Sequence, residues 1–197
     1  APDGELPPLI VESHGGPTGN ATAAFSLGVQ FWTSRGFGFV DVDYGGSTGY
    51  GRAYRERLNG QWGVVDLADC VNAARYLVDQ AQADASRLLI TGGSAGGYTT
   101  LACLAFGDAF RAGASLYGVS DLALLAEDTH KFESRYLDRM VGPYPAMADR
   151  YRDRSPIHVL GRIACPVLVL QGLDDKVVLP SQAEALVAAL AANDIPH

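Results

Sequence analysis

The chain has 197 residues, which suits one domain or most of one, and 48% of them are hydrophobic, too many for a disordered segment. Its 15 Lys and Arg against 22 Asp and Glu give a net charge of -7, which argues against nucleic acid as the main partner because phosphate binding requires clustered positive charge. No apolar run approaches the ~18 residues that span a bilayer, so we expect a soluble domain with no membrane segment.

Short apolar runs bounded by Gly or Pro predict five buried strands, at residues 8–11, 37–42, 87–91, 112–117 and 166–170. The intervening segments predict helices at residues 21–34, 65–80, 95–106, 122–127 and 182–192. Strands that alternate with helices indicate an α/β fold, with a mostly parallel central sheet and helices on both faces. Residues 130–156 are less regular, and we expect them to pass over the sheet edge, where specificity elements often lie.

The cysteines and the first residues exclude several other classes of protein. Cys70, Cys103 and Cys165 are an odd and widely spaced set, so we expect buried small side chains and neither a disulfide framework nor a metal site. Residues 1–5 lack the charged lead and apolar stretch of a signal peptide. We expect a cytoplasmic location and leave a periplasmic one open.

The most informative motif is a serine between a strand and a helix. Gly92-Gly93-Ser94-Ala95-Gly96 has the form G-x-S-x-G, follows an apolar strand and precedes an Ala- and Leu-rich helix. This is the context of a nucleophile elbow, whose tight turn needs small neighbours. A glycine-rich phosphate loop is the alternative, although neither GxxxxGK[ST] nor GxGxxG fits well. The pattern favours Ser94 as a nucleophile at the amino end of a helix.

Backbone donors for an oxyanion are expected after the first strand, at Ser13-His14-Gly15-Gly16-Pro17. Glycine at this place lets a backbone N–H face the site. We predict that the N–H groups of Gly16 and Ala95 hold the oxyanion, each contributing ~3 kcal/mol to transition-state stabilisation. An ordinary turn is the alternative, and His14 is expected to order this loop rather than to act as a base.

A carboxylate follows the last predicted strand, at Asp174-Asp175. The carboxyl ends of parallel strands meet at one sheet edge, so this carboxylate should share an edge with Ser94 and could orient a histidine. Either aspartate could instead stabilise a turn. Of the histidines, His130 and His158 precede the aspartates, and His197 should open the next strand at the opposite edge, ~17–20 Å away. We therefore expect the general base to lie beyond residue 197.

Together the motifs resemble the catalytic domain of the prolyl oligopeptidase family of serine peptidases, closest to its acylaminoacyl-peptidase and dipeptidyl-aminopeptidase branch. The resemblance covers nearly the whole chain. It rests on HGGP at 14–17, YGGSTGYG at 44–51, WGVVDLAD at 62–69, GGSAGGY at 92–98, DTHKFESRYLD at 128–138, SPI at 155–157 and QGLDDKVV at 171–178. As a set these motifs are specific, whereas G-x-S-x-G alone would indicate only an α/β-hydrolase.

The resemblance implies an α/β-hydrolase domain that cleaves short peptides behind a size-filtering β-propeller. The family's serine and aspartate match Ser94 and Asp174, which is the reason for choosing Asp174 over Asp175. It also implies that Lys176 contacts substrate, and that three residues shape the pocket for the residue before the scissile bond: Phe132, Tyr136 and Val177. Other matching positions look structural in the family: Trp62, Asp66 and Asp69. The family's propeller, first strands and histidine motif would fall outside residues 1–197, so we expect a single catalytic domain that is incomplete at both ends.

The leading hypothesis is a serine peptidase that forms an acyl-enzyme on Ser94, with a peptide as its partner and no metal or organic cofactor. The isolated 197 residues are expected to be inactive for want of the base. A carboxylesterase-like acyl hydrolase is one alternative, and a non-catalytic α/β-hydrolase-fold binding module is another. The sequence leaves self-association into a homo-oligomer open.

Overall fold

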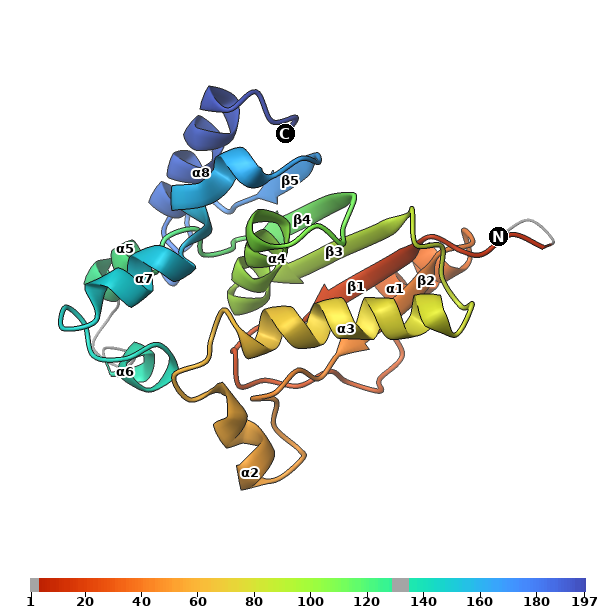
Figure 1. The fold of residues 1–197 in the computed structure, drawn as a ribbon, viewed down its shortest axis with the longest axis horizontal. Coiled ribbons are helices and arrows are strands. Elements are labelled where there is room, and N and C mark those ends of the chain that lie inside the picture. The colour runs from red at the N-terminus through yellow and green to blue at the C-terminus, as the bar shows by residue number, and fades with distance from the viewer. Residues whose placement is uncertain (1–3, 129–134) are drawn as a thin grey trace.

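The computed structural model describes residues 4–128 and 135–197, and it contains one parallel sheet (Figure 1). The sheet has five strands in the order β2-β1-β3-β4-β5, and every neighbouring pair is parallel. The strands are β1 (Leu9–Ser13), β2 (Gly38–Val42), β3 (Leu88–Gly93), β4 (Ala112–Leu116) and β5 (Val167–Leu170). All five predicted strands are therefore present, as is the predicted α/β fold with a parallel sheet.

Helices connect the strands and surround the sheet. The α-helices are α1 (Leu27–Thr33), α2 (Arg52–Arg55), α3 (Val65–Asp79), α4 (Ala95–Phe106), α5 (Leu122–Asp128), α6 (Tyr136–Met140), α7 (Ala148–Arg154) and α8 (Pro180–Ala192). Two 3-10 helices are η1 (Glu56–Leu58) and η2 (Pro156–Arg162). Figure 1 shows α3 and α4 across one face of the sheet and α1 behind it, whereas α2, α5, α6 and α7 lie beyond the carboxyl ends of the strands.

Two predicted helices begin at other residues than expected, and two short helices within residues 130–156 were not predicted. The helix predicted at 21–34 begins only at Leu27, because Ser26 caps it and accepts the N–H of Val29, while Asp43 binds the N–H of Ala21 and holds the preceding residues in a loop. The last helix starts at Pro180, two residues early, where a proline suits the first turn. The irregular stretch 130–156 contains α6 and α7, which are too short to show a clear period.

The core lies between the sheet and the α3–α4 layer. Helix α4 is buried along almost its whole length, and Val11, Ile90 and Leu101 are among the completely covered side chains. Burial of this apolar area is the main favourable term in folding. Within the described ranges, no helix is both long and apolar enough to cross a membrane.

Candidate active site

Ser94 occupies the turn between β3 and α4. Its φ of 56° and ψ of -121° lie in a region that non-glycine residues rarely adopt, which costs roughly 1–3 kcal/mol and is typical of functional turns. The N–H of Ser94 donates to the Leu116 carbonyl at 2.9 Å and holds the turn against β4. The side chain is only half-buried, so its hydroxyl can meet a substrate. This is the nucleophile-elbow geometry that the sequence predicts.

Small neighbours allow this turn to pack against the adjacent strand. A Cβ at Gly96 would collide with the Ser13 carbonyl oxygen at the end of β1. A Cβ at Gly97 would lie 2.6 Å from the Gly118 Cα. The predicted need for small residues around the serine therefore has a direct cause, because two backbone segments approach α4 within van der Waals contact.

The loop that follows β1 reaches Ser94. A Cβ at Gly15 would lie 3.7 Å from the Ser94 Cβ and 3.2 Å from the Gly93 carbonyl oxygen. Gly16 has a φ of 126°, which an L side chain would disfavour. In the part of the chain that the structure describes, neither the Gly16 N–H nor the Ala95 N–H donates to a protein acceptor. Both predicted oxyanion donors thus flank the serine and are unused.

His14 holds this loop rather than facing the serine. Its Nδ1 lies 2.8 Å from the Gly15 carbonyl oxygen, and its Nε2 lies 2.6 Å from the Ser47 Oγ. Tyr44 stacks on the imidazole at 4.2 Å and donates its hydroxyl to the His14 carbonyl at 2.9 Å. Burial raises the pKa of the Tyr44 phenol well above its usual value, so it remains a donor. These contacts agree with the loop-ordering role expected for His14.

The hydrogen bond from His14 to the Gly15 carbonyl also orients the N–H of Gly16. In a trans peptide the carbonyl of one residue and the N–H of the next point in opposite directions. A hydrogen bond from His14 Nδ1 to the Gly15 carbonyl therefore fixes the plane that carries the Gly16 N–H, and directs that N–H away from the imidazole. His14 therefore orients the Gly16 N–H, the predicted oxyanion donor, through the peptide group that joins Gly15 to Gly16.

The two aspartates after β5 have different surroundings. The Asp175 carboxylate accepts the N–H groups of Val177 and Val178 at 2.8 and 3.0 Å, and thereby stabilises the turn. Asp174 is exposed and accepts no hydrogen bond from the described residues. Asp175 is therefore the turn carboxylate, and among the described residues Asp174 is the one of the two without a hydrogen-bond donor; the catalytic role that the family resemblance implies for Asp174 stays a prediction.

No described histidine lies beside Asp174. The ring of His14 is engaged in its own loop, and His158 is exposed on η2. The Pro196 carbonyl accepts the N–H of Val167 at the start of β5, so His197 lies at the amino edge of the sheet, as expected. His130 lies outside the described residues.

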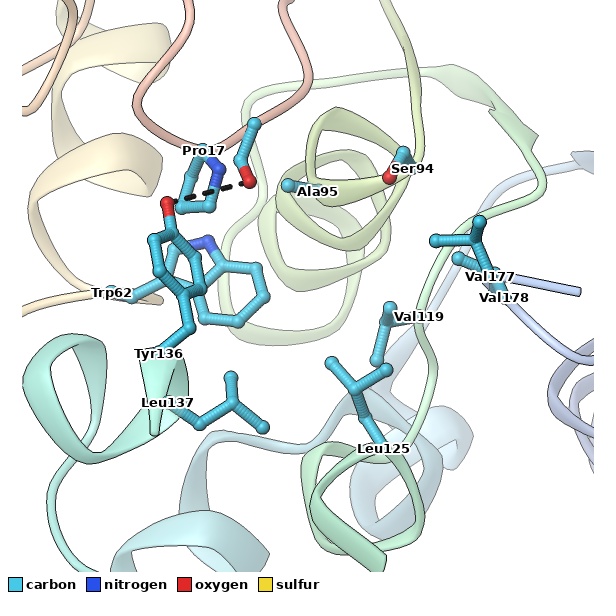
Figure 2. A pocket seen from close by; sticks show the side chains of 11 residues that line it. Pro17, Trp62, Ser94, Ala95, Val119, Leu125, Tyr136, Leu137, Val177 and Val178 are labelled. Carbon is cyan, nitrogen blue, oxygen red and sulfur yellow. Dashed lines mark hydrogen bonds between the residues drawn. The ribbon is translucent and has the colours of Figure 1, made fainter. Parts of the chain in front are cut away.

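An apolar pocket opens beside Ser94 (Figure 2). Its apolar wall consists of Trp62, Val119, Leu125, Tyr136, Leu137, Val177 and Val178, and its mouth of Gly16, Pro17, Ser94 and Ala95. Figure 2 shows Tyr136, Trp62 and Leu137 on one side and Val119, Leu125, Val177 and Val178 on the other.

The residues to which the resemblance assigned substrate contact or pocket shape divide into three groups. Tyr136 and Val177 line the pocket as implied. Lys176 is exposed and does not belong to its wall, and Phe132 lies outside the described residues. Tyr136 also contacts the loop that follows β1, because its hydroxyl lies 3.0 Å from the Thr18 Oγ1 and donates to the Gly16 carbonyl at 3.4 Å.

Sequence reasoning missed five pocket residues: Val119, Leu125, Leu137, Val178 and Trp62. Val119 follows β4, so the rule that ligands bind at the carboxyl ends of strands could have found it. Trp62 was expected to be structural, and it is 2% exposed, but one side of its ring also forms pocket wall. Leu125 and Leu137 lie on short helices whose position no local pattern reveals.

Asp66 and Asp69 support the site from behind, as expected of structural residues. Asp66 is fully buried at the start of α3 and accepts the N–H of Gly63 at 2.7 Å and the Thr99 hydroxyl at 2.6 Å. Burial raises the pKa of the Asp66 carboxyl, and hydrogen bonds from Thr99 and the backbone partly offset this effect. Asp69 accepts the N–H of Gly45 at 2.8 Å. Both carboxylates tie loops to the helix layer that carries Ser94.

The described residues contain no group of three or more His, Cys, Asp or Glu side chains that could hold a metal ion. Cys70 and Cys103 are buried, Cys165 is partly buried, and all three are free thiols.

Comparison with known proteins decides the family. Residues 23–197 match the model of the prolyl oligopeptidase family. The chain belongs to this family. It is 31% identical over 195 residues to dipeptidyl peptidase family member 6 of Caenorhabditis elegans, a match that covers 95% of the chain and 26% of that protein.

Solved structures of family members superpose closely on the chain. A puromycin-hydrolyzing peptidase of Mycobacterium tuberculosis is 55% identical, with a TM-score of 0.97 over 99% of this chain and 30% of that one. Pyrococcus horikoshii acylaminoacyl peptidase is 29% identical, with a TM-score of 0.92 over 100% of this chain and 32% of that one. The family fold is therefore confirmed, and the chain spans about a quarter to a third of these relatives' lengths.

Proposed function

We propose that the protein containing this chain is a serine peptidase that cleaves short peptides through an acyl-enzyme on Ser94. One observation carries the proposal: a half-buried serine at positive φ stands between an apolar pocket and two unused backbone N–H groups. The peptidase names of the relatives support an amide rather than an ester substrate, and they disfavour a purely binding role.

The first chemical step is attack of the Ser94 Oγ on the peptide carbonyl carbon. The hydroxyl proton passes to a histidine outside the described residues, which Asp174 orients and whose positive charge it stabilises. The carbonyl oxygen takes up negative charge between the N–H groups of Gly16 and Ala95, each worth ~3 kcal/mol in the transition state. The tetrahedral intermediate then expels the amine, which receives the proton from the histidine.

Water completes the cycle by the reverse sequence. The histidine removes a proton from water, the hydroxide oxygen bonds to the acyl carbon, and the ester to Ser94 breaks with return of a proton to its Oγ. All these steps use groups at the carboxyl edge of the sheet, where β3 and β5 present Ser94 and Asp174. No step requires a cofactor.

The pocket beside Ser94 suits an apolar or aromatic side chain on the residue before the scissile bond. Its wall carries no charged group in the described part of the chain. Burying such a side chain contributes roughly 1.5–3 kcal/mol. We further propose puromycin as a substrate, because it presents an aromatic aminoacyl group on an amide bond and the chain is 55% identical to a puromycin-hydrolyzing peptidase.

The test uses the full-length protein and its Ser94→Ala variant. A fluorophosphonate should label the wild type on Ser94, and the variant should lose labelling together with cleavage of puromycin and of phenylalanyl and alanyl nitroanilides. Comparable hydrolysis of the nitroanilides by Ser94→Ala would refute the proposed role of Ser94. Efficient turnover of a simple ester alone, with no amide cleaved, would instead establish the esterase alternative.

A further inference from the structure

A second, charged hollow adjoins the apolar pocket on the far side of Tyr136. Tyr136 lines both hollows, and Thr18, which contacts the Tyr136 hydroxyl, lines the second one. Arg55, Arg135 and Arg139 line this hollow, which we name the arginine hollow. A substrate side chain in the apolar pocket would therefore be separated from these guanidinium groups by a single aromatic ring.

The arginines come from two segments that the backbone holds together. Arg55 ends α2, whereas Arg135 precedes α6 and Arg139 lies within it. The N–H of Gly60 donates to the Arg139 carbonyl at 2.8 Å, and the N–H of Trp62 donates to the Met140 carbonyl at 3.2 Å. The two walls of the arginine hollow are therefore fixed to each other before any ligand binds.

Two of the three guanidinium groups have no side-chain partner within the ranges 4–128 and 135–197 that the structure describes. Arg139 lies 3.6 Å from the Glu56 carboxylate and donates its Nε to the Asn59 Oδ1 at 2.9 Å. Among the described residues, neither Arg55 nor Arg135 has a side-chain hydrogen bond or ion pair. No carboxylate lines the hollow in the described part of the chain. The hollow therefore carries surplus positive charge.

This cluster of positive charge contrasts with the negative net charge of the whole chain. The whole sequence has a net charge of -7, yet an adjoining hollow, shared through Arg55, adds Arg52 and again has no carboxylate among its described lining residues. Guanidinium groups form planar forks that match a carboxylate, with two parallel N–H donors to its two oxygens. Peptides supply carboxylates in their acidic side chains and at their carboxyl termini.

We propose that the arginine hollow binds a carboxylate of the peptide substrate, at a residue other than the one in the apolar pocket. This inference rests on the proposed peptidase function, because it assigns the ligand from the substrate that the neighbouring pocket would hold. The ion pair orients the peptide and raises kcat/KM for acidic peptides. The substrate class is thus a short peptide with one apolar and one acidic position.

The test compares matched peptides with the full-length protein. All peptides keep Phe before the cleaved bond and carry a free amino terminus and an amidated carboxyl terminus, so that Glu supplies the only carboxylate. One pair places Glu or its neutral analogue Gln on the amino side of Phe, and a second pair places them on the carboxyl side. In one pair we expect kcat/KM to be about three- to tenfold higher for Glu than for Gln, and the ratio should fall with added salt.

Variants then assign the effect to the arginines. Arg55→Gln combined with Arg135→Gln should bring the Glu-to-Gln ratio close to one. The control is Arg75→Gln, which removes another exposed arginine, on α3, whose side chain pairs with Asp108 at 3.9 Å; this variant should keep the wild-type ratio. Because the ratio compares two substrates of the same variant, a loss of folded protein does not alter it.

Three results would overturn the proposal. The first is an equal kcat/KM for Glu and Gln peptides in the wild type. This result is expected if carboxylates of the protein itself occupy the hollow. The second is a ratio that survives the double arginine variant. If neither peptide is cleaved and Ser94 is not labelled, the proposed function fails and this inference fails with it, whereas equal cleavage leaves the proposed function intact.

Discussion

Replacement of His14 tests whether its hydrogen bond to the Gly15 carbonyl orients the Gly16 N–H, the proposed oxyanion donor. Asparagine places its amide N–H₂ near the position of the imidazole Nδ1, which bonds the Gly15 carbonyl at 2.8 Å. Glutamine reaches instead toward the position of Nε2, which contacts the Ser47 Oγ at 2.6 Å. Alanine supplies neither donor. The three variants therefore separate the contact that fixes the Gly15–Gly16 peptide from the contact that only anchors the ring.

The expected magnitudes follow from the value of one oxyanion donor. Complete loss of such a donor lowers kcat by about 10²–10³-fold. His14→Ala and His14→Gln leave the Gly15 carbonyl without its donor, so we expect each to lower kcat about a hundredfold. His14→Asn should remain within about tenfold of the wild type. KM should change little in all three variants, since the donor acts on charge that develops in the transition state.

The assay is steady-state hydrolysis of puromycin or a phenylalanyl nitroanilide by the full-length protein. The kcat of each variant is divided by the folded fraction of its preparation, which is measured from the cooperative unfolding transition. Equal kcat values for the asparagine and glutamine variants would refute the reasoning, because the peptide plane would then not depend on Nδ1. A change confined to KM would also refute it, since it would place His14 in ground-state binding.

Three further predictions concern the turn, the acid and the buried carboxylate. Gly96→Ala should lower the free energy of unfolding by at least about 2 kcal/mol in denaturant titrations, because its Cβ meets the Ser13 carbonyl, whereas Gly172→Ala, with open space around it, should change it by less than about 0.5 kcal/mol. Asp174→Asn should lower kcat by about 10⁴-fold, but Asp175→Asn by less than about tenfold because an amide oxygen still accepts both turn N–H groups; similar losses would contradict the assignment. Burial raises the pKa of Asp66 in the folded chain, so the free energy of unfolding of the wild type should fall as pH rises from below the usual aspartate range toward neutrality. Asp66→Asn lacks this loss, so its free energy of unfolding relative to that of the wild type should increase over the same interval. A constant difference between the two proteins would contradict this.

The serine turn and the sheet could be predicted because their signals are local. An apolar strand, G-x-S-x-G and an Ala-rich helix specify a strand–turn–helix unit with no reference to distant residues. The false start of the helix at residue 21 shows the opposite case, since the bond that keeps Ala21 out of the helix comes from Asp43, 22 positions away. Distant hydrogen bonds of this kind leave no periodic trace in the sequence.

The sequence indicated candidate reacting groups and, through the family resemblance, the pocket residues Tyr136 and Val177, but it did not indicate most of the pocket wall. Asp174 and Asp175 have the same chemistry and adjacent positions, and only the folded turn shows that Asp175 is occupied by backbone donors. Leu125 and Leu137 enter the pocket from short helices beyond the sheet, whose placement depends on tertiary contacts.

Tyr136 contributes both to the pocket and to the loop that follows β1. Its ring lines the pocket, while its hydroxyl contacts the loop that carries Gly16, the proposed oxyanion donor. A smaller residue at position 136 would enlarge the pocket, but it would also remove the hydroxyl that contacts Thr18 and the Gly16 carbonyl. In the proposed peptidase, side-chain preference and transition-state stabilisation would both depend on the Tyr136 side chain, so a change of preference would be easier at Val119 or Val177, which line the same pocket.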